Sequence, residues 1–153
     1  MMTTVRTILL AEDNQNDVEL TLAALRGNHV ANEVVVVRDG AEALDYLYRR
    51  GRFTSRTENP VLVLLDLKMP KVDGLEVLRQ IKGDAGLRTI PVVMLTSSRE
   101  ENDLFQTYDL GVNAYVVKPV EFASFVEAVK VLGTFWAVIN ETPAAPPPGP
   151  EAR

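Results

Sequence analysis

Short apolar runs alternate along the chain with longer stretches in which apolar residues recur at three- and four-residue intervals. A short continuous apolar run is typical of a strand that is buried on both faces of a parallel sheet. The three- and four-residue spacing is typical of a helix that buries one face. The runs that predict strands are Ile8–Ala11, Val34–Val37, Val61–Asp66, Val92–Leu95 and Ala114–Val117.

A predicted helix follows each of these strands. The helices are centred on Val18–Leu25, Ala43–Leu47, Leu75–Ile81 and Glu100–Leu110, and the last one runs from Glu121 to about Ile139. Asn16, with Glu19 three residues later, resembles a capping pair at the start of the first helix. The polar segment 51–60 predicts a surface loop.

This alternation of strands and helices predicts an α/β fold, with a doubly wound five-stranded parallel sheet and helices on both faces. A chain of 153 residues is long enough for one domain with a substantial core. We assign residues 1–140 to that domain. Residues 141–153 consist mostly of Pro, Ala and Gly, and we expect them to form a disordered tail.

Composition excludes several classes of function. The formal net charge of −5 argues against non-specific binding to nucleic acid, which needs a basic face. The chain has no cysteine, so disulfides, thiolate zinc sites and thiol nucleophiles are excluded. No apolar stretch has the length of a membrane span, and the first apolar run is too short for a signal peptide. We therefore expect a cytoplasmic protein that binds neither nucleic acid nor a membrane.

Polar residues that could carry chemistry stand at the ends of the predicted strands. They are Glu12, Asp13, Asp66, Thr96 and Lys118. Because the carboxyl ends of parallel strands meet at one edge of a sheet, these side chains should converge there. Clustered carboxylates stay ionised only beside a compensating cation, and a set of oxygen ligands suits Mg²⁺. Lys118 could then bind a phosphoryl group that Asp66 accepts as a nucleophile, although Thr96 taken alone could merely end a strand.

The order and spacing of these residues, together with Met69-Pro70 and Lys118-Pro119, resemble the receiver domain of bacterial response regulators over residues 5 to about 132. The resemblance implies the flavodoxin-like sheet order 2-1-3-4-5, with Asp66 as the phosphoacceptor. The other roles that it implies are Mg²⁺ binding by Glu12, Asp13, Asp66 and the Lys68 carbonyl, phosphoryl binding by Thr96 and Lys118, an aromatic switch at Tyr115, and a cis peptide bond before Pro119. Tyr115 taken alone could be an ordinary core residue.

The resemblance also implies a signalling switch rather than an enzyme that acts on diffusible substrates. A partner histidine kinase would phosphorylate Asp66, and the polar segment 51–60 and Thr134–Trp136 resemble receivers that are paired with phytochrome-type kinases. No output domain is evident, so we expect the signal to pass by protein contact. Two alternatives stay open. One is an aspartyl phosphatase of the haloacid dehalogenase type, which Lys68 disfavours because that family has a second Asp there. The other is a receiver that is used only for docking.

The last predicted helix carries a second apolar stripe besides the one that packs on the sheet. Its members are Ala128, Val131, Phe135, Val138 and Ile139. A helix on the outside of a domain needs only one apolar face. The second stripe therefore predicts a homodimer interface, formed by Val131, Phe135 and Val138. The alternatives are that the Pro-rich tail covers this stripe or that the helix bends after Gly133.

Overall fold

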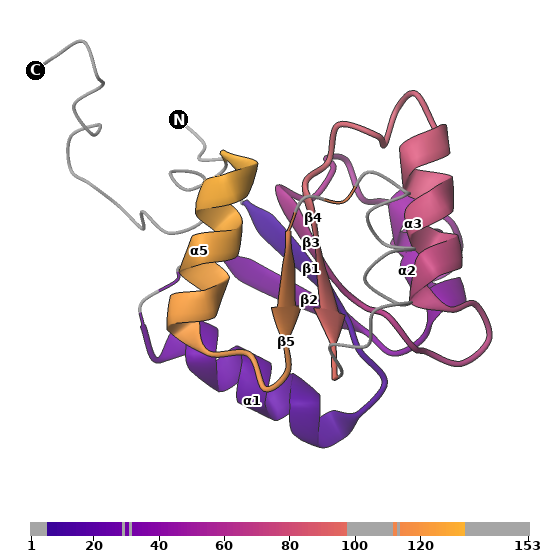
Figure 1. Ribbon diagram of the computed structural model, residues 1–153. Helices are drawn as coiled ribbons and strands as arrows, with labels where there is room; N and C mark the ends of the chain where they lie inside the picture. Colours follow the sequence, from indigo (N-terminus) through magenta and orange to yellow (C-terminus); the bar gives the residue numbers. More distant parts are fainter. Residues whose placement is uncertain (1–5, 29, 31, 98–111, 113, 134–153) are drawn as a thin grey trace, which may run out of the picture.

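Parallel strands form one five-stranded sheet in the computed structural model, which describes residues 6–28, 30, 32–97, 112 and 114–133. The strands are β1 (Thr7–Ala11), β2 (Glu33–Val37), β3 (Leu62–Asp66), β4 (Val92–Thr96) and β5 (Tyr115–Val117). Their spatial order is β2-β1-β3-β4-β5, and all neighbouring pairs run parallel (Figure 1). The predicted sheet and its order are confirmed.

Helices cover both faces of this sheet (Figure 1). One face carries α1 (Gln15–Arg26) and α5 (Phe122–Leu132), and the other carries α2 (Gly40–Tyr48) and α3 (Gly74–Gly83). In β3, Leu62 and Leu64 belong to the apolar cluster on the first face, whereas Val63 and Leu65 belong to the cluster on the second. The continuous apolar sequence of β3 therefore follows from its burial on both faces.

The predicted loop between α2 and β3 contains a short 3₁₀ helix, η1 (Gly51–Phe53), and is attached to α2 through Arg56. The Arg56 Nε donates a hydrogen bond to the Tyr46 carbonyl at 2.8 Å, and Nη2 donates one to the Leu47 carbonyl at 2.9 Å. The guanidinium also lies 4.6 Å from the centre of the Tyr46 ring. One arginine thus binds two carbonyls in the last turn of α2, of which the Tyr46 carbonyl also accepts from the Arg49 N–H at 3.2 Å.

Two helix boundaries differ from the prediction. Asn14, and not Asn16, is the N-cap of α1, because its side chain accepts a hydrogen bond from the Asp17 N–H at 2.9 Å. At the other end of the chain, α5 stops at Leu132, and Gly133 adopts the left-handed conformation with φ of 74°. A continuous helix from Glu121 to Ile139 is therefore wrong at Gly133, which ends it. Ala128 is also wrongly placed in the second stripe, since it is buried in the core.

Several predicted features lie outside the described residues. They are the helix Glu100–Leu110, the interface residues Phe135 and Val138, the domain boundary at residue 140 and the tail 141–153. Among the residues that are described, no helix combines the length and the apolar character that crossing a membrane requires.

Candidate metal and phosphoryl site

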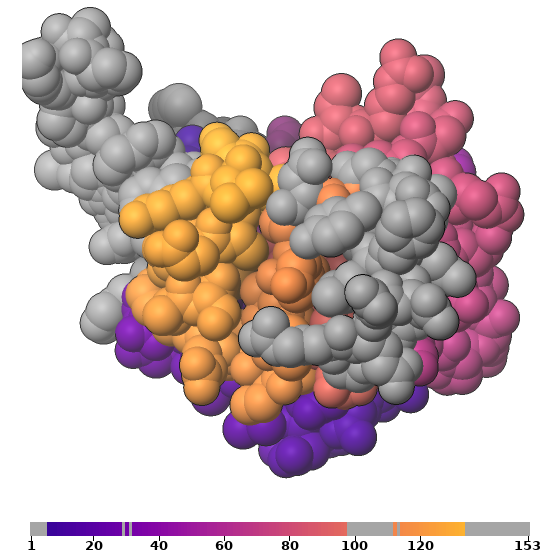
Figure 2. Space-filling view, viewed as in Figure 1, coloured from indigo at the N-terminus to yellow at the C-terminus, as the bar shows by residue number. Residues whose placement is uncertain are grey.

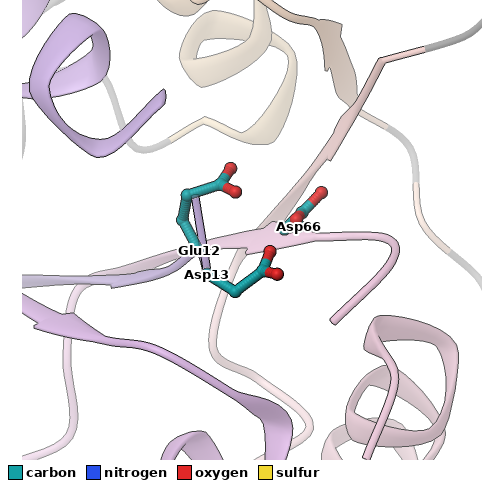
Figure 3. Close-up of side chains that lie close together, drawn as sticks. All are labelled: Glu12, Asp13 and Asp66. Atoms are coloured by element: carbon teal, nitrogen blue, oxygen red, sulfur yellow. The ribbon is translucent and has the colours of Figure 1, made fainter. Parts of the chain in front are cut away.

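Three carboxylates come together at the carboxyl edge of the sheet. Glu12, Asp13 and Asp66 each offer an oxygen, and these oxygens lie within 4.8 Å of one another. Figure 3 shows Glu12 and Asp13 on consecutive residues at the end of β1 and Asp66 at the end of β3. Glu12 and Asp66 are buried, whereas Asp13 is exposed, so the cluster is open to solvent on one side.

The strand register produces this cluster. β1 and β3 are hydrogen-bonded neighbours, with Ala11 opposite Leu65, so the residues that follow each of them emerge side by side. The backbone also holds the acidic pair, since the Glu12 N–H donates to the Val37 carbonyl at 3.0 Å. Glu12 Oε2 accepts a hydrogen bond from the Asn14 N–H at 3.1 Å. The acidic residues are thus part of the ordered sheet edge rather than of a loose loop.

The loop after Asp66 turns back sharply into α3. The Gly74 N–H donates to the Leu67 carbonyl at 2.9 Å. A Cβ atom at Gly74 would lie 2.1 Å from the Asp66 carbonyl oxygen, well inside van der Waals contact. Only glycine therefore allows the start of α3 to approach the backbone of Asp66 this closely.

Lys118 brings a positive charge to the carboxylates. Its Nζ lies 3.0 Å from Glu12 Oε1, 3.0 Å from Asp17 Oδ2 and 3.3 Å from Asp66 Oδ1. Its backbone N–H donates to the Thr96 carbonyl at 2.7 Å, which fixes the end of β5 against the end of β4. The peptide bond between Lys118 and Pro119 is cis, as predicted.

Burial and neighbouring charges shift the protonation of both key groups. Burial raises the pKa of Asp66, and the Glu12 carboxylate raises it further against the opposing effect of Lys118, to about 7. Burial alone would lower the pKa of Lys118, but hydrogen bonds to Glu12 and Asp17 outweigh it, so the pKa is raised and the ammonium stays charged. A further cation among the carboxylates would favour ionised Asp66.

The other predicted site residues are Thr96, Tyr115 and Lys68, and they differ in how deeply they are buried. Thr96 is buried at the end of β4, where its backbone pairs with Val117 of β5. Tyr115 begins β5 opposite Met94 and is half-buried against the core. Lys68 is exposed in the loop, two residues beyond Asp66.

Asp17 is a residue of the site that the sequence interpretation missed. Asp17 lies in the first turn of α1, and its carboxylate contacts Lys118. The sequence feature that could have indicated this role is its position four residues after Asp13, at the start of the helix that follows the carboxyl edge of the sheet. By contrast Asp73, which precedes α3, caps that helix and is not part of the site.

A sheet of this order, with an acidic cluster beside a lysine at its carboxyl edge, defines the class of two-component receiver domains. Residues 8–130 match the family described as the response regulator receiver domain. The chain belongs to this family, which confirms the predicted resemblance and its role in two-component signalling. The alternative of a haloacid dehalogenase-type phosphatase is thereby overturned.

Three similar proteins have more specific names. The response regulator Rcp1 of Synechocystis sp. is 37% identical over 140 residues, which are 92% of this chain and 95% of that protein. A solved structure of Rcp1 in its Mn²⁺-bound form matches with a TM-score of 0.71, over 93% of this chain and 99% of that chain. The bacteriophytochrome response regulator AtBRR is 61% identical, with a TM-score of 0.84 over 91% of this chain and 100% of that chain. The phosphorylated cyanobacterial phytochrome response regulator RcpA is 44% identical, with a TM-score of 0.73 over 87% and 94% of the two chains.

Proposed function

We propose that Asp66 accepts a phosphoryl group from the phosphohistidine of a partner histidine kinase. An Asp66 oxygen attacks phosphorus, and the new P–O bond forms as the P–N bond to the histidine breaks, with the nitrogen leaving on its electron pair. The observation that carries this proposal is the place of the Asp66 carboxylate, 3.3 Å from Lys118 Nζ and inside a cluster with Glu12 and Asp13. The approaching phosphoryl group thereby meets a fixed ammonium group.

We propose that the cation of this site is Mg²⁺, held by Glu12, Asp13, Asp66 and the Lys68 carbonyl. The chemistry of the donors supports this choice, because the side-chain ligands are carboxylates and one side of the cluster is open for water and a phosphoryl oxygen. Bound there, Mg²⁺ would supply positive charge against the developing negative charge of the transferred group.

Thr96 and Lys118 would bind the phosphoryl oxygens, and Tyr115 would report the change to the surface. Thr96 lies at the end of β4, and its carbonyl accepts a hydrogen bond from the Lys118 N–H. Tyr115 lies on β5, the short strand that directly precedes Lys118. It also lines a surface pocket of about 330 Å³ between β5 and α5. A movement of Lys118 toward the phosphoryl group would therefore be transmitted to this pocket.

We propose that the donor is a histidine kinase of the phytochrome type and that the output is a protein contact. The support is the high identity to AtBRR over nearly the whole of both chains. The exchange would take place in the cytoplasm, where the kinase has ATP, and would involve neither nucleic acid nor a membrane.

Self-association through the C-terminal region also remains our proposal. Val131 of α5 is 62% exposed and lines the pocket beside β5, and Figure 2 shows α5 and β5 side by side on the molecular surface. The support for a partner surface is the apolar pattern of the sequence, in which Phe135 and Val138 follow Val131 at four- and three-residue intervals. Light scattering over a dilution series tests it, with Phe135→Glu as the disrupting variant. A chain that stays monomeric at tens of micromolar would refute the dimer.

The phosphoacceptor is tested by intact-protein mass spectrometry after incubation with acetyl phosphate and Mg²⁺. We expect one adduct that hydroxylamine removes, as an acyl phosphate requires, and no adduct in Asp66→Asn. The matched control is Asp45→Asn on α2, where the Asp45 carboxylate is paired at 3.3 Å with Arg50, which lies beyond the end of the helix. Wild-type labelling of Asp66→Asn would place the acceptor elsewhere, and an unlabelled wild type would favour the docking-only alternative.

A further inference from the structure

The ammonium group of Lys118 is shared among three carboxylates that come from three different elements. Glu12 follows β1, Asp66 ends β3, and Asp17 lies in the first turn of α1. The distances from Nζ are 3.0, 3.3 and 3.0 Å in that order. An ammonium has three N–H donors, so these three carboxylates can occupy all of them.

Asp17 differs from the other two carboxylates in its relation to the metal cluster. Glu12 and Asp66 belong to the group whose oxygens lie close enough to hold one ion, together with Asp13, and Asp17 does not belong to it. Asp17 therefore contacts Lys118 from outside the cluster. Its backbone is fixed by the hydrogen bond from its own N–H to Asn14 Oδ1, so the carboxylate is presented by an ordered helix start.

We propose that Asp17 is a positioning residue that competes with the phosphoryl group for Lys118. A phosphoryl group on Asp66 offers new anionic oxygens, and Lys118 can bind them fully only by giving up another partner. Glu12 is engaged with the cation, so the partner to be released is Asp17. Asp17 thus stabilises the unphosphorylated arrangement of the switch.

This inference rests on the proposed function of Asp66, and it predicts a change that a purely structural ion pair would not cause. Asp17→Asn keeps the size of the side chain and an oxygen that accepts a hydrogen bond, but it removes the charge. The variant should therefore bind a phosphoryl analogue more tightly than the wild type does. The matched control is Glu19→Gln, which removes the same charge from the exposed side of α1, where Glu19 contacts Gln15.

The experiment is calorimetric titration of each full-length protein with beryllium fluoride in saturating Mg²⁺. We expect Asp17→Asn to bind about fivefold more tightly than the wild type, a factor typical of one ion pair near a protein surface. Glu19→Gln should stay within about twofold of the wild type. In a Lys118→Ala background, adding Asp17→Asn should have no further effect, because the competition acts through Lys118. Asp17→Ser provides a second variant if Asp17→Asn folds poorly.

Equal affinities of Asp17→Asn and Glu19→Gln would overturn the proposal, as would a gain that persists without Lys118. A wild type that shows no binding of beryllium fluoride would instead contradict the proposed function of Asp66, so the two failures are distinguishable. Titration with Mg²⁺ alone tests whether the metal site itself has changed, because loss of a negative charge acting through the general field would lower the affinity for a cation. If Asp17→Asn raised the affinity for Mg²⁺ by the same factor, the gain would not come from release of Lys118, and the proposal would fail.

Discussion

At the scale of single residues, Asp66 combines a buried position with the proposed task of a nucleophile. Burial and the Glu12 carboxylate raise its pKa to about 7, so the metal-free protein holds a substantial protonated fraction at neutral pH. A protonated carboxyl is a poor nucleophile. The same burial shields an acyl phosphate from water once it has formed. In the proposed mechanism, cation binding would favour the ionised form of Asp66 and so prepare it for phosphorylation.

The raised pKa of Asp66 predicts a pH-dependent stability. Between pH 3.8 and about 7 the folded protein binds more protons at Asp66 than the unfolded chain does, so the free energy of unfolding falls as the pH rises through this window. Asp66→Asn removes this contribution. We expect the variant to be more stable than the wild type by about 1 to 3 kcal/mol at pH 8 without divalent ions, and the difference to shrink toward pH 4.

Urea unfolding at several pH values measures this difference. Asp45→Asn is the control, because its exposed carboxylate should give no comparable pH-dependent gain. Adding Mg²⁺ at pH 8 should stabilise the wild type more than Asp66→Asn. If the difference in the free energy of unfolding between the wild type and Asp66→Asn did not depend on pH, Asp66 would not titrate in this window.

The strand-end residues of the site could be predicted from the sequence because each follows an apolar run that fixes its place. Glu12, Asp13, Asp66 and Thr96 are of this kind. Asp17 could not be assigned in the same way, because its role depends on which residue caps α1. Asn14 and Asn16 are both plausible N-caps. The choice between them decides whether Asp17 lies in the first turn of the helix, and so where its carboxylate points.

At the scale of elements, the start of α3 is fitted against the backbone of Asp66. Gly74→Ala would place a methyl group 2.1 Å from the Asp66 carbonyl oxygen and 2.8 Å from that of Leu67. We expect it to lower the free energy of unfolding by about 2 to 4 kcal/mol, since both neighbours are backbone atoms that cannot turn aside. Thermal or urea unfolding of the purified variant measures the loss.

Gly83→Ala is the control in the same helix. A Cβ atom there meets nothing within 4 Å, so the variant should be unchanged or more stable by about 0.5 kcal/mol because alanine favours helix. Equal stabilities of the two variants would contradict the close approach at Gly74.

Arg56 attaches the segment after η1 to α2. Arg56→Ala removes hydrogen bonds to the Tyr46 and Leu47 carbonyls and a contact with the Tyr46 ring. We expect a loss of about 1 to 3 kcal/mol in unfolding experiments. Arg50→Ala, which breaks an exposed pair with Asp45 and a contact with the Tyr48 ring but no hydrogen bond to α2 carbonyls, should cost about 1 kcal/mol or less. Equal losses of stability in Arg56→Ala and Arg50→Ala would contradict the proposed role of Arg56.

Element types could be predicted from periodicity, but the anchors and ends between them could not. The polar composition of segment 51–60 indicates a loop, whereas the use of Arg56 as a cap for α2 depends on a tertiary contact. The end of α5 was misjudged for a related reason. Apolar residues continue beyond Gly133 at helical spacing, and the pattern does not record that the glycine turns into the left-handed conformation.

At the scale of the whole molecule, Lys118 connects α1, β1 and β3 through one ammonium group. Lys118→Ala leaves buried carboxylates without this partner, and we expect the metal-free protein to lose about 2 to 4 kcal/mol at pH 8. Millimolar Mg²⁺ should restore most of this loss, because a bound cation replaces the missing charge. Urea unfolding with Mg²⁺ and with EDTA gives both values.

Arg79→Ala is the matched control, since it removes a positive charge from an exposed pair with Glu76 on α3. Its stability should change by about 0.5 kcal/mol or less and should not depend on Mg²⁺. A Lys118 variant whose stability is equally indifferent to Mg²⁺ would refute the neutralising role of the lysine.

The position of Lys118 in the chain also orders events during synthesis on the ribosome. The carboxylates of the site are made early, whereas their ammonium partner emerges after β5, which pairs with β4 at the edge of the sheet. A nascent chain that has paired β1 with β3 therefore holds its acidic residues together without this counter-charge, and their repulsion opposes a stable sheet. Docking of β5 brings the Lys118 ammonium to these carboxylates, and α5 then completes the core. A half-made chain also lacks the ammonium group that would bind the transferred phosphoryl group, so we expect competence to receive the signal to arrive together with the completed fold.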